Sequence, residues 1–248
     1  MARRTKLNGS CWIALSLAVV ILTGCSDDRF GSQEPVTAQG HHTLGLWKGF
    51  FITAAVVGAL VLGLIAYVLI RFRRRGVDIP SQRDANIPLE IVYTMTPILI
   101  VVVLFAFSVA VEHKVNRKVA RPDLVVNVTG FQWGWQFEYP DQHVTITGTA
   151  NTTPPQLVLP VGRTSRLVLR TQDVNHSLWV PQFLVKRDMI AGVDNAIDVK
   201  PDRVGTYEGK CAEYCSLDHW RMIFDVRVVP PEEFDQALAD AQQVAAGR

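Results

Sequence analysis

Two long runs without a charged side chain limit the folds open to this 248-residue chain. Gly49–Ile70 has 22 residues and Ile91–Val111 has 21. At a rise of about 1.5 Å per residue, a helix of either length crosses the roughly 30 Å hydrocarbon core of a bilayer. The sequence therefore predicts two transmembrane helices, at residues 49–70 and 89–111.

The charges next to the first run predict how the chain crosses the membrane. Arg71, Arg73, Arg74 and Arg75 follow it directly, and clustered Lys and Arg are typical of the cytoplasmic end of a span. The first helix then runs from outside to inside. Residues 71–88 become a cytoplasmic loop, and the second helix returns the chain to the outside.

Residues 1–24 have the pattern of a bacterial secretion signal. A basic start precedes the apolar run Cys11–Thr23, which is too short for a stable span. The run ends in Leu22-Thr23-Gly24-Cys25, typical of a lipobox, in which peptidase cleavage leaves a lipidated Cys25. The alternative is an uncleaved membrane anchor. Both interpretations place residues 25–48 outside the cytoplasm as a polar linker.

From residue 112 to residue 230 the chain is polar, and short β-type runs alternate with turn residues. This pattern predicts a compact antiparallel β-sandwich, followed by a short surface helix and tail at 231–248. The net charge of only +2 gives no argument for a nucleic-acid partner. The strands are expected at Asp123–Thr129, Phe131–Tyr139, Val144–Gly148, Gln156–Pro160, Thr164–Leu169 and Met222–Val229.

The segment Gly209–Met222, GKCAEYCSLDHWRM, gathers side chains that bind soft metals. Sulfur and imidazole ligands suit copper better than magnesium or calcium. A zinc site would normally pair two cysteines with two histidines at other spacings. A disulfide or a redox dithiol is the other alternative, but it leaves the histidine and the methionine without a role. The candidate ligands are Cys211, Glu213, Cys215, His219 and Met222.

This segment supplies too few ligands for a closed site, and His176 is the best additional candidate. It lies at an expected strand start, 35 residues before Cys211. Blue-copper sites likewise combine an early histidine with Cys, His and Met from a late loop. A second cysteine lets two thiolates bridge two coppers. The ligands would then be two sulfurs, two imidazoles, one thioether and a backbone carbonyl near Glu213.

The motif C-x-E-x-C-x3-H-x2-M and the upstream D-x-x-H-S-x-x-V-P segment resemble subunit II of haem–copper cytochrome c oxidases. The resemblance covers nearly the whole mature chain. It implies a two-helix transmembrane hairpin followed by a Greek-key cupredoxin domain. It also implies a binuclear copper centre, CuA, whose ligands would be His176, Cys211, Cys215, His219, Met222 and the main-chain carbonyl of Glu213.

The same resemblance implies the partners of the chain. The Glu213 side chain would bind a magnesium ion shared with subunit I, and Trp133 would receive electrons from cytochrome c or another c-type cytochrome. Glu90 would lie at the mouth of a proton channel into subunit I. The haem would belong to that partner, because this chain has no C-x-x-C-H motif. The complex would be a proton-pumping cytochrome c oxidase that reduces oxygen to water. It would lie in the bacterial plasma membrane, with further oxidase subunits and with the CuA domain outside.

Some residues depart from the pattern of the family or allow a plainer interpretation. Gly134 stands where an aromatic residue is usual, Tyr93 replaces a tryptophan, and Ser216 replaces a glycine. Glu90 could simply favour the N-terminal end of a helix dipole, and Trp133 could be ordinary core. The rival functions are a quinol oxidase subunit II, a membrane-anchored copper-delivery protein and a nitrous oxide reductase type domain.

Overall fold

The computed structural model describes residues 28–74, 76, 82 and 84–247. The expected signal segment 1–24 and the expected lipidation site Cys25 lie outside the described residues. The chain divides into two compact units, Met1–Glu34 and Pro35–Arg248. The second unit holds every helix and strand of the fold described below.

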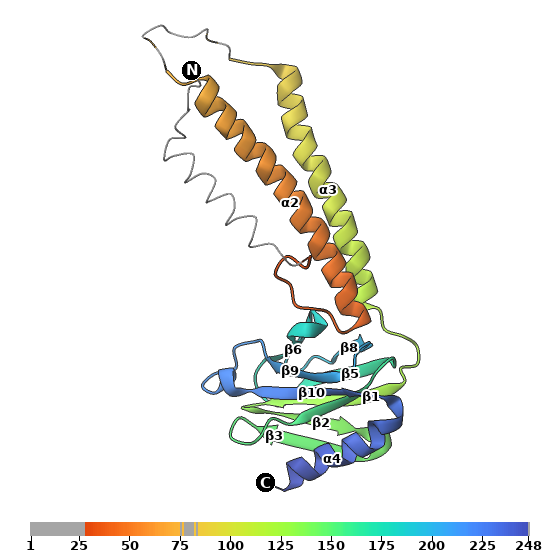
Figure 1. Ribbon diagram of the computed structural model, residues 1–248. Coiled ribbons are helices and arrows are strands. Elements are labelled where there is room, and N and C mark those ends of the chain that lie inside the picture. The colour runs from red at the N-terminus through yellow and green to blue at the C-terminus, as the bar shows by residue number, and fades with distance from the viewer. Residues whose placement is uncertain (1–27, 75, 77–81, 83, 248) are drawn as a thin grey trace, which may run out of the picture. The chain divides into compact units, whose positions relative to one another are not determined.

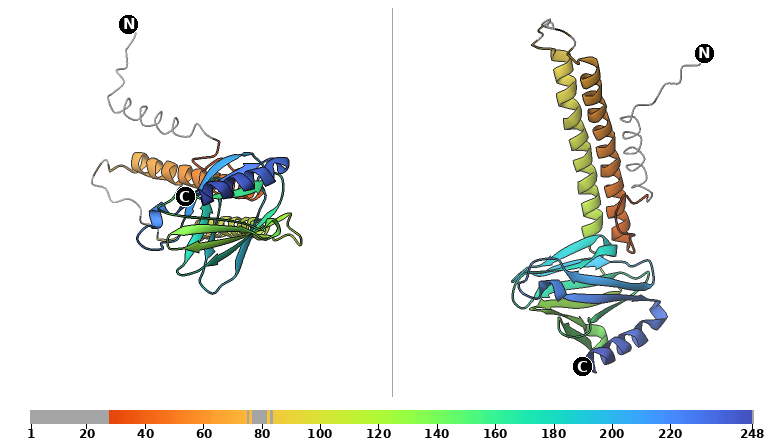
Figure 2. Two further views of the ribbon diagram at one scale, coloured as in Figure 1. Left: turned by 90° about the horizontal axis from the view of Figure 1, so that it is seen from below. Right: turned by 60° about the vertical axis from the view of Figure 1, so that its left-hand side comes forward.

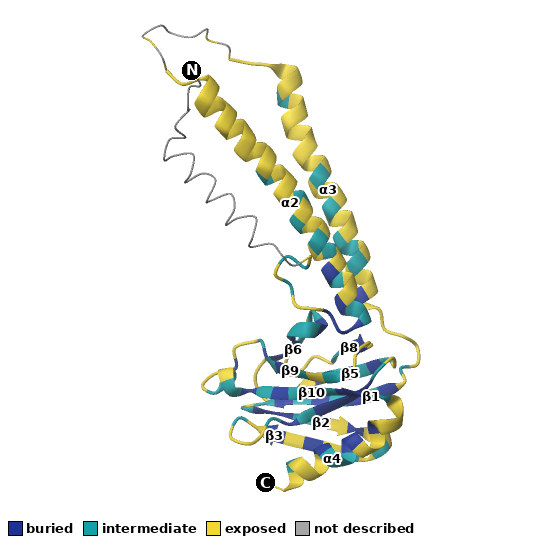
Figure 3. Ribbon diagram, viewed as in Figure 1, coloured by how far each residue is buried: buried dark blue, intermediate teal, exposed yellow. Residues whose placement is uncertain are grey.

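Two long helices, α2 (Ala38–Arg71) and α3 (Ile87–Asn116), lie side by side (Figures 1 and 2). Both are long and apolar enough to cross a membrane, with a mean hydropathy of 2.5 in their most apolar windows, and none of those windows is buried. Figure 3 shows that they expose most of their length, whereas buried residues gather in the strands. Each helix extends beyond its uncharged run. The side chain of Thr37 caps the start of α2 by accepting from Gly40 N at 3.0 Å.

The remaining chain forms two five-stranded sheets packed as a sandwich. One sheet has the order β3-β2-β1-β5-β8 and the other β4-β10-β9-β6-β7. This confirms the fold expected from the sequence, a helical hairpin followed by a β-sandwich. The strands are β1 (Leu124–Phe131), β2 (Gly134–Tyr139), β3 (Val144–Thr149), β4 (Gln156–Pro160), β5 (Ser165–Thr171), β6 (His176–Val180), β7 (Val185–Met189), β8 (Asn195–Val199), β9 (Gly205–Cys211) and β10 (Ile223–Val229).

The expectation of a wholly antiparallel sandwich is wrong for two strand pairs. β1 lies parallel to β5, with Leu124 opposite Ser165, and β10 lies parallel to β4, with Asp225 opposite Gln156. The alternation of apolar and polar residues shows which face of a strand is buried, but it does not reveal the direction of the neighbouring strand. The parallel pairs therefore could not be predicted from those runs.

Aromatic side chains fill the space between the sheets. Trp135 and Phe137 on β2 are fully buried and meet Phe224 of β10, with ring centroids 4.9 and 5.5 Å apart. One end of the core is covered by α4 (Phe234–Ala246), whose Phe234 ring contacts that of Tyr139 at 6.3 Å. This packed interior gives the sandwich a rigid frame.

The segment before α2 is bound to the sandwich. Thr37 bridges Pro201, and Val36 N donates to Gln182 O at 3.1 Å. His41 is half exposed and pairs with Asp202 at 2.8 Å. The first turn of α2 is thus held by backbone and side-chain bonds.

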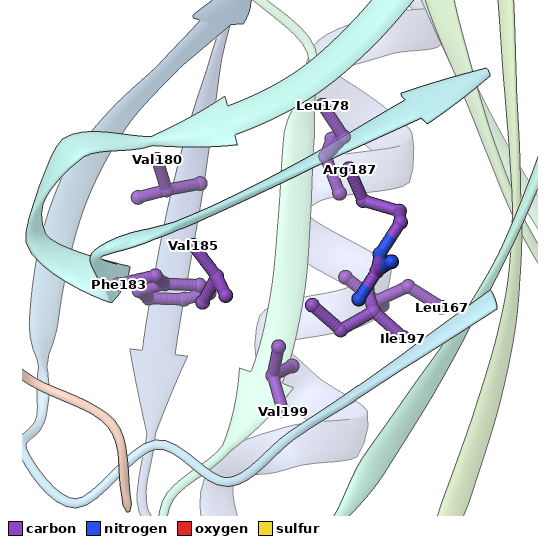
Figure 4. A pocket seen from close by; sticks show the side chains of 8 residues that line it. All are labelled: Leu167, Leu178, Val180, Phe183, Val185, Arg187, Ile197 and Val199. Atoms are coloured by element: carbon purple, nitrogen blue, oxygen red, sulfur yellow. The ribbon is translucent and has the colours of Figure 1, made fainter. Parts of the chain in front are cut away.

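The end of α3 is held by an arginine from β7. Arg187 lines a small cavity together with Leu167 and Ile197 (Figure 4), and its Nη2 donates to Asn116 Oδ1. The Nε of Arg187 has no hydrogen-bond partner within the described part of the chain. The cavity of about 10 Å³ has room for about one water molecule.

Candidate metal centre

The segment Gly209–Met222 covers the end of β9 and the loop that connects β9 to β10. Lys210 pairs with Ile223 in the antiparallel ladder, and Cys211 N donates to Met222 O at 3.0 Å. The two ends of the segment are therefore held together by the sheet. Between them the chain makes one short 3₁₀ turn, His219–Arg221.

His176 comes from the neighbouring strand of the same sheet. It begins β6, as expected from the sequence, and Leu178 of β6 lies opposite Cys211 of β9. His176 therefore lies at the end of the sheet where the β9–β10 loop leaves it. Its side chain is fully buried.

Six donor atoms converge at this end of the sandwich. The two cysteine sulfurs are 3.9 Å apart. Nδ1 of His176 lies 3.7 Å from Cys211 Sγ, and the carbonyl oxygen of Glu213 lies 3.2 Å from the same sulfur. Nδ1 of His219 and Sδ of Met222 lie 3.5 and 3.8 Å from Cys215 Sγ. The structure thus brings together all six residues expected to supply metal ligands.

These separations suit atoms that share metal ions. Ligands about 2.0–2.3 Å from one tetrahedral ion lie roughly 3.3–3.8 Å from each other. A disulfide would need sulfurs about 2.05 Å apart, and both cysteines are free. Ligand atoms of His176, Cys211 and Cys215 all lie within 4.8 Å of one another, and Nδ1 of His219 lies 3.5 Å from Cys215 Sγ. The two imidazoles therefore approach different sulfurs.

The two thiols differ in how readily they lose a proton. Burial raises the pKa of Cys211. Hydrogen bonds with the His176 side chain and with the backbone of Glu213 and Ser177 outweigh this effect and bring the pKa below its usual value. Burial, and next the charge of the neighbouring Cys211, raise the pKa of Cys215 to about 12. Metal binding would have to displace that proton, because thiolates are the ligands.

Hydrogen bonds from neighbouring residues hold His176 and the β9–β10 loop in place. Asp173 Oδ1 lies 2.9 Å from His176 Nε2, so the ring directs its other nitrogen to Cys211. Trp133 Nε1 donates to Cys215 O at 2.9 Å, and Trp135 Nε1 donates to Met222 O at 3.2 Å. Such bonds around the ligands orient metal sites in proteins.

Comparison with known proteins agrees with this geometry. A family model described as cytochrome C oxidase subunit II, periplasmic domain, matches residues 124–229, and one described as its transmembrane domain matches residues 27–111. A "probable cytochrome c oxidase subunit 2" of Streptomyces avermitilis is 38% identical over 270 residues, covering 92% of this chain and 85% of the relative. The chain belongs to the cytochrome c oxidase subunit II family.

Other members of the subunit II family show similar agreement. The cytochrome c oxidase subunit 2 of Mycobacterium bovis is 30% identical over 286 residues, covering 90% of this chain and 79% of the relative. The crystal structure of the periplasmic domain of subunit II from Bradyrhizobium japonicum is 31% identical, with a TM-score of 0.45, and covers 52% of this chain and 99% of that one. The two family models and these relatives confirm the resemblance to oxidase subunit II that the sequence predicts. The match to the transmembrane model and the two long apolar helices support membrane anchoring.

The side chains of Glu213 and Glu90, to which the family resemblance gives a role, point away from the two cysteine sulfurs or lie far from them. The Glu213 carboxylate is half exposed and pairs with Lys186 Nζ at 3.3 Å. Glu90 lies at the opposite end of α3, where its Oε1 accepts from Asn86 N at 2.9 Å. That bond satisfies one of the free N–H groups at the helix start. The helix-terminus interpretation of Glu90 is thus visible in the structure.

Three residues near the cluster received no role from the sequence. Asp173 is the acid of the D-x-x-H-S motif, and an acid three positions before a histidine is well placed to bond it. Gln132 Nε2 donates to Cys215 O at 2.9 Å, and Gly130 lies against the His176 ring. No local pattern distinguished Gln132 or Gly130, because their contacts come from strands far apart in the sequence.

The unusual Gly134 of this subunit II has a physical explanation. A Cβ built at Gly134 would lie 2.3 Å from Gly148 O and 2.7 Å from Cζ of Phe131. The Phe131 ring and the backbone of Gly148 therefore occupy the space that any side chain at position 134 would need, and only glycine fits there without a shift of its neighbours.

Proposed function

We propose that this chain is the electron-accepting subunit of a proton-pumping cytochrome c oxidase. It would receive electrons from cytochrome c at a binuclear copper centre and deliver them to the haem of subunit I, where oxygen is reduced to water. The observation that carries the proposal is the convergence of four donor atoms, two imidazole nitrogens, a thioether sulfur and a backbone carbonyl oxygen, on two neighbouring cysteine sulfurs.

The donor set fits copper by its chemistry. Two thiols, two imidazoles and a thioether favour copper over magnesium or calcium. His176, Cys211, Cys215, His219 and Met222 would hold the metal, with the carbonyl of Glu213 completing the set. When bound, a copper pair that shares its charge across two sulfurs would gain and lose one electron with little change in bond lengths.

The protein around these ligands contributes rigidity and exclusion of water. Cys211, Cys215 and Met222 are at most 5% exposed, and His176 is fully buried. His176 and Cys211 extend from the paired strands β6 and β9. The carbonyl of Met222 accepts hydrogen bonds from Trp135 Nε1 and Cys211 N. A site fixed in this way cannot relax far when its charge changes, which favours fast electron transfer.

Trp133 is the side chain that we assign to electron input. Its ring is half buried, and its indole N–H bonds directly to the carbonyl of Cys215 at 2.9 Å. The bond gives a short path from a partly exposed aromatic ring to a sulfur ligand. A docked cytochrome c could therefore pass electrons through this ring without reaching the buried ligands.

The assignments at the membrane extend the same proposal. The Glu213 side chain would bind magnesium at the interface with subunit I, after leaving Lys186. Glu90 would lie at the mouth of the proton channel at the inner side of the membrane. The chain would cross the plasma membrane twice, with the copper domain outside and Cys25 lipidated after removal of residues 1–24. Residues 25–48 would lie outside the cytoplasm, and residues 71–88 would form a cytoplasmic loop.

The rival functions receive less support. A quinol oxidase subunit II would have the same helices and sandwich without the copper ligands, and the donor set here is intact. A copper-delivery protein would need neither the hydrogen bond between Trp133 and Cys215 nor an acidic residue at position 90. A nitrous oxide reductase type domain would not be expected behind two membrane helices.

The test is a substitution of one bridging sulfur in the full-length chain, purified in detergent and loaded with copper. Cys215→Ser should abolish the mixed-valence electron-spin signal, whereas Ser216→Ala in the adjacent position should keep it. A mixed-valence signal that survives in Cys215→Ser would show that the two sulfurs do not bridge a copper pair.

A further inference from the structure

The turn between β1 and β2 brings two consecutive side chains to one carbonyl group. Gln132 Nε2 and Trp133 Nε1 each donate to Cys215 O at 2.9 Å. The backbone N–H of Gln132 donates to Asp173 Oδ2 at 2.7 Å. Gln132 is therefore bonded on one side to the β9–β10 loop and on the other to the acid that orients His176.

The second donor restricts how the tryptophan can move. A ring held only by one N–H···O bond can pivot about that bond and about its own side-chain torsions. When the preceding residue is bonded to the same carbonyl and its backbone to Asp173, the turn has three fixed points. The indole ring of Trp133 then keeps one distance and one angle to Cys215.

The two donors also act on the charge of the site. Both N–H dipoles point at the carbonyl of a residue whose thiolate would bind metal. Hydrogen-bond donors near a site stabilise additional negative charge there, and gaining an electron adds such charge. Removing one donor should therefore lower the reduction potential of the centre.

We propose that Gln132 is a positioning residue for electron input, which fixes the Trp133 ring against Cys215 and supports the reduced state of the metal site. This inference rests on the proposed function, because it assumes that Trp133 accepts electrons for a copper centre. Gln132 itself need not touch the donor protein or the metal. It acts through the carbonyl of Cys215 and the carboxylate of Asp173.

The first measurement uses the metal-free full-length chain in detergent. Hydrogen exchange of the Trp133 indole N–H is followed by nitrogen-resolved NMR in Gln132→Leu and Gln132→Glu. Losing one hydrogen bond worth about 1 kcal/mol should speed this exchange about fivefold. Gln136→Leu is the matched control, because Gln136 lies in β2 of the same hairpin opposite Thr129 and Thr147.

The second measurement uses the copper-loaded chain. Gln132→Leu should slow electron uptake from reduced cytochrome c and lower the reduction potential, while the visible absorption bands of the ligands stay as in wild type. A purely structural role would change the absorption bands and the potential together. The Gln136→Leu control should change neither quantity.

The inference is overturned if Trp133 indole exchange in the Gln132 variants equals that of the Gln136→Leu control. Gln132→Glu carries the test if the leucine variant does not fold, since the carboxylate has similar size but cannot donate. Failure of the proposed function has a different signature: wild type would bind no copper pair, or Trp133→Phe would leave electron uptake unchanged. The metal-free exchange measurement decides the positioning role in either case.

Discussion

The imidazole of His176 packs directly on the backbone of Gly130. A Cβ built at Gly130 would lie 3.1 Å from Cγ and Cδ2 of the ring, closer than carbon atoms normally approach. The absence of a side chain on β1 therefore sets how far the His176 ring can sit inside the sandwich. The position of a candidate ligand on one sheet is thus determined by a glycine on the other.

Gly130→Ala should push the His176 ring outward by a few tenths of an ångström and weaken copper binding. Changes beside a metal ligand typically cost 10–100-fold in affinity, and we expect about tenfold here. Competition with a copper chelator measures the effect. Gly247→Ala is the control, since its Cβ would meet only Gln243 O at 3.4 Å. Equal copper affinity in both variants would show that Gly130 does not limit the ring.

An ion pair between the buried Asp198 and the partly exposed Arg166 holds the chain between α3 and β1 to the sandwich. Arg166 Nε and Nη2 donate to both oxygens of Asp198, at 2.7 and 2.8 Å, and Val119 N donates to the same carboxylate at 2.7 Å. Asp198 is 2% exposed. Arg166→Met would leave this carboxylate without its cation, and breaking a buried pair in this way costs about 3–5 kcal/mol.

The matched control for Arg166 is a similar pair at the surface. Arg170 donates to Asp194 at 3.0 Å, but the two side chains are 54% and 80% exposed. Arg170→Met should cost less than about 1 kcal/mol. Urea unfolding in detergent, followed by near-ultraviolet circular dichroism, compares the two variants. Equal losses of unfolding free energy would contradict the structural role given to Asp198.

Two acids face each other across β9 and β10. Asp225 lies opposite Glu208 in the ladder, and burial, then repulsion from Glu208, raise the pKa of Asp225 above its usual value. The folded state therefore favours the protonated form. Its stabilising contribution is present below the unfolded pKa of about 3.9 and is lost as pH rises through the folded pKa.

Asp225→Asn should accordingly stabilise the protein at pH 7, by about 0.5 kcal/mol, and the gain should vanish below about pH 4. Thermal unfolding at several pH values measures this. Glu208→Gln should give a gain of similar origin, so the double variant should gain less than the sum of the two. Additive gains would show that the two acids do not interact.

Glu90 has two roles that one substitution separates. Glu90→Gln keeps an oxygen that can accept from Asn86 N, so the start of α3 should remain intact. It removes the titratable proton, and oxygen-reduction turnover in the assembled oxidase should fall at least tenfold if Glu90 admits protons. Glu90→Ala removes both roles and serves for comparison. Unchanged turnover in Glu90→Gln would leave only the helix-terminus role.

Much of the architecture follows from local patterns in the sequence. The uncharged runs predict α2 and α3, and a short β-type run predicts β4 at the bounds observed, Gln156–Pro160. Three strands, β7, β8 and β9, were not expected. The strand β7 reads VKRDM and buries only Met189 fully, so its residues show no alternation of apolar and polar side chains.

In the candidate site, too, some features could be predicted from the sequence and others could not. The spacing of sulfur and imidazole ligands within one loop, and the strand start at His176, could be predicted because residue type and chemistry suffice. The contacts of Gly130 and Gln132 could not, because they depend on how β1 and the turn after it lie against His176 and the β9–β10 loop. Tertiary packing, rather than any local propensity, sets these contacts.

The copper content of the full-length chain tests the central claim most directly. The chain is purified in detergent, loaded with copper and measured by metal analysis and electron-spin resonance. The proposed function predicts two coppers per chain and a mixed-valence signal in which one unpaired electron is shared by both metals. One copper per chain, or zinc in its place, would contradict the binuclear centre.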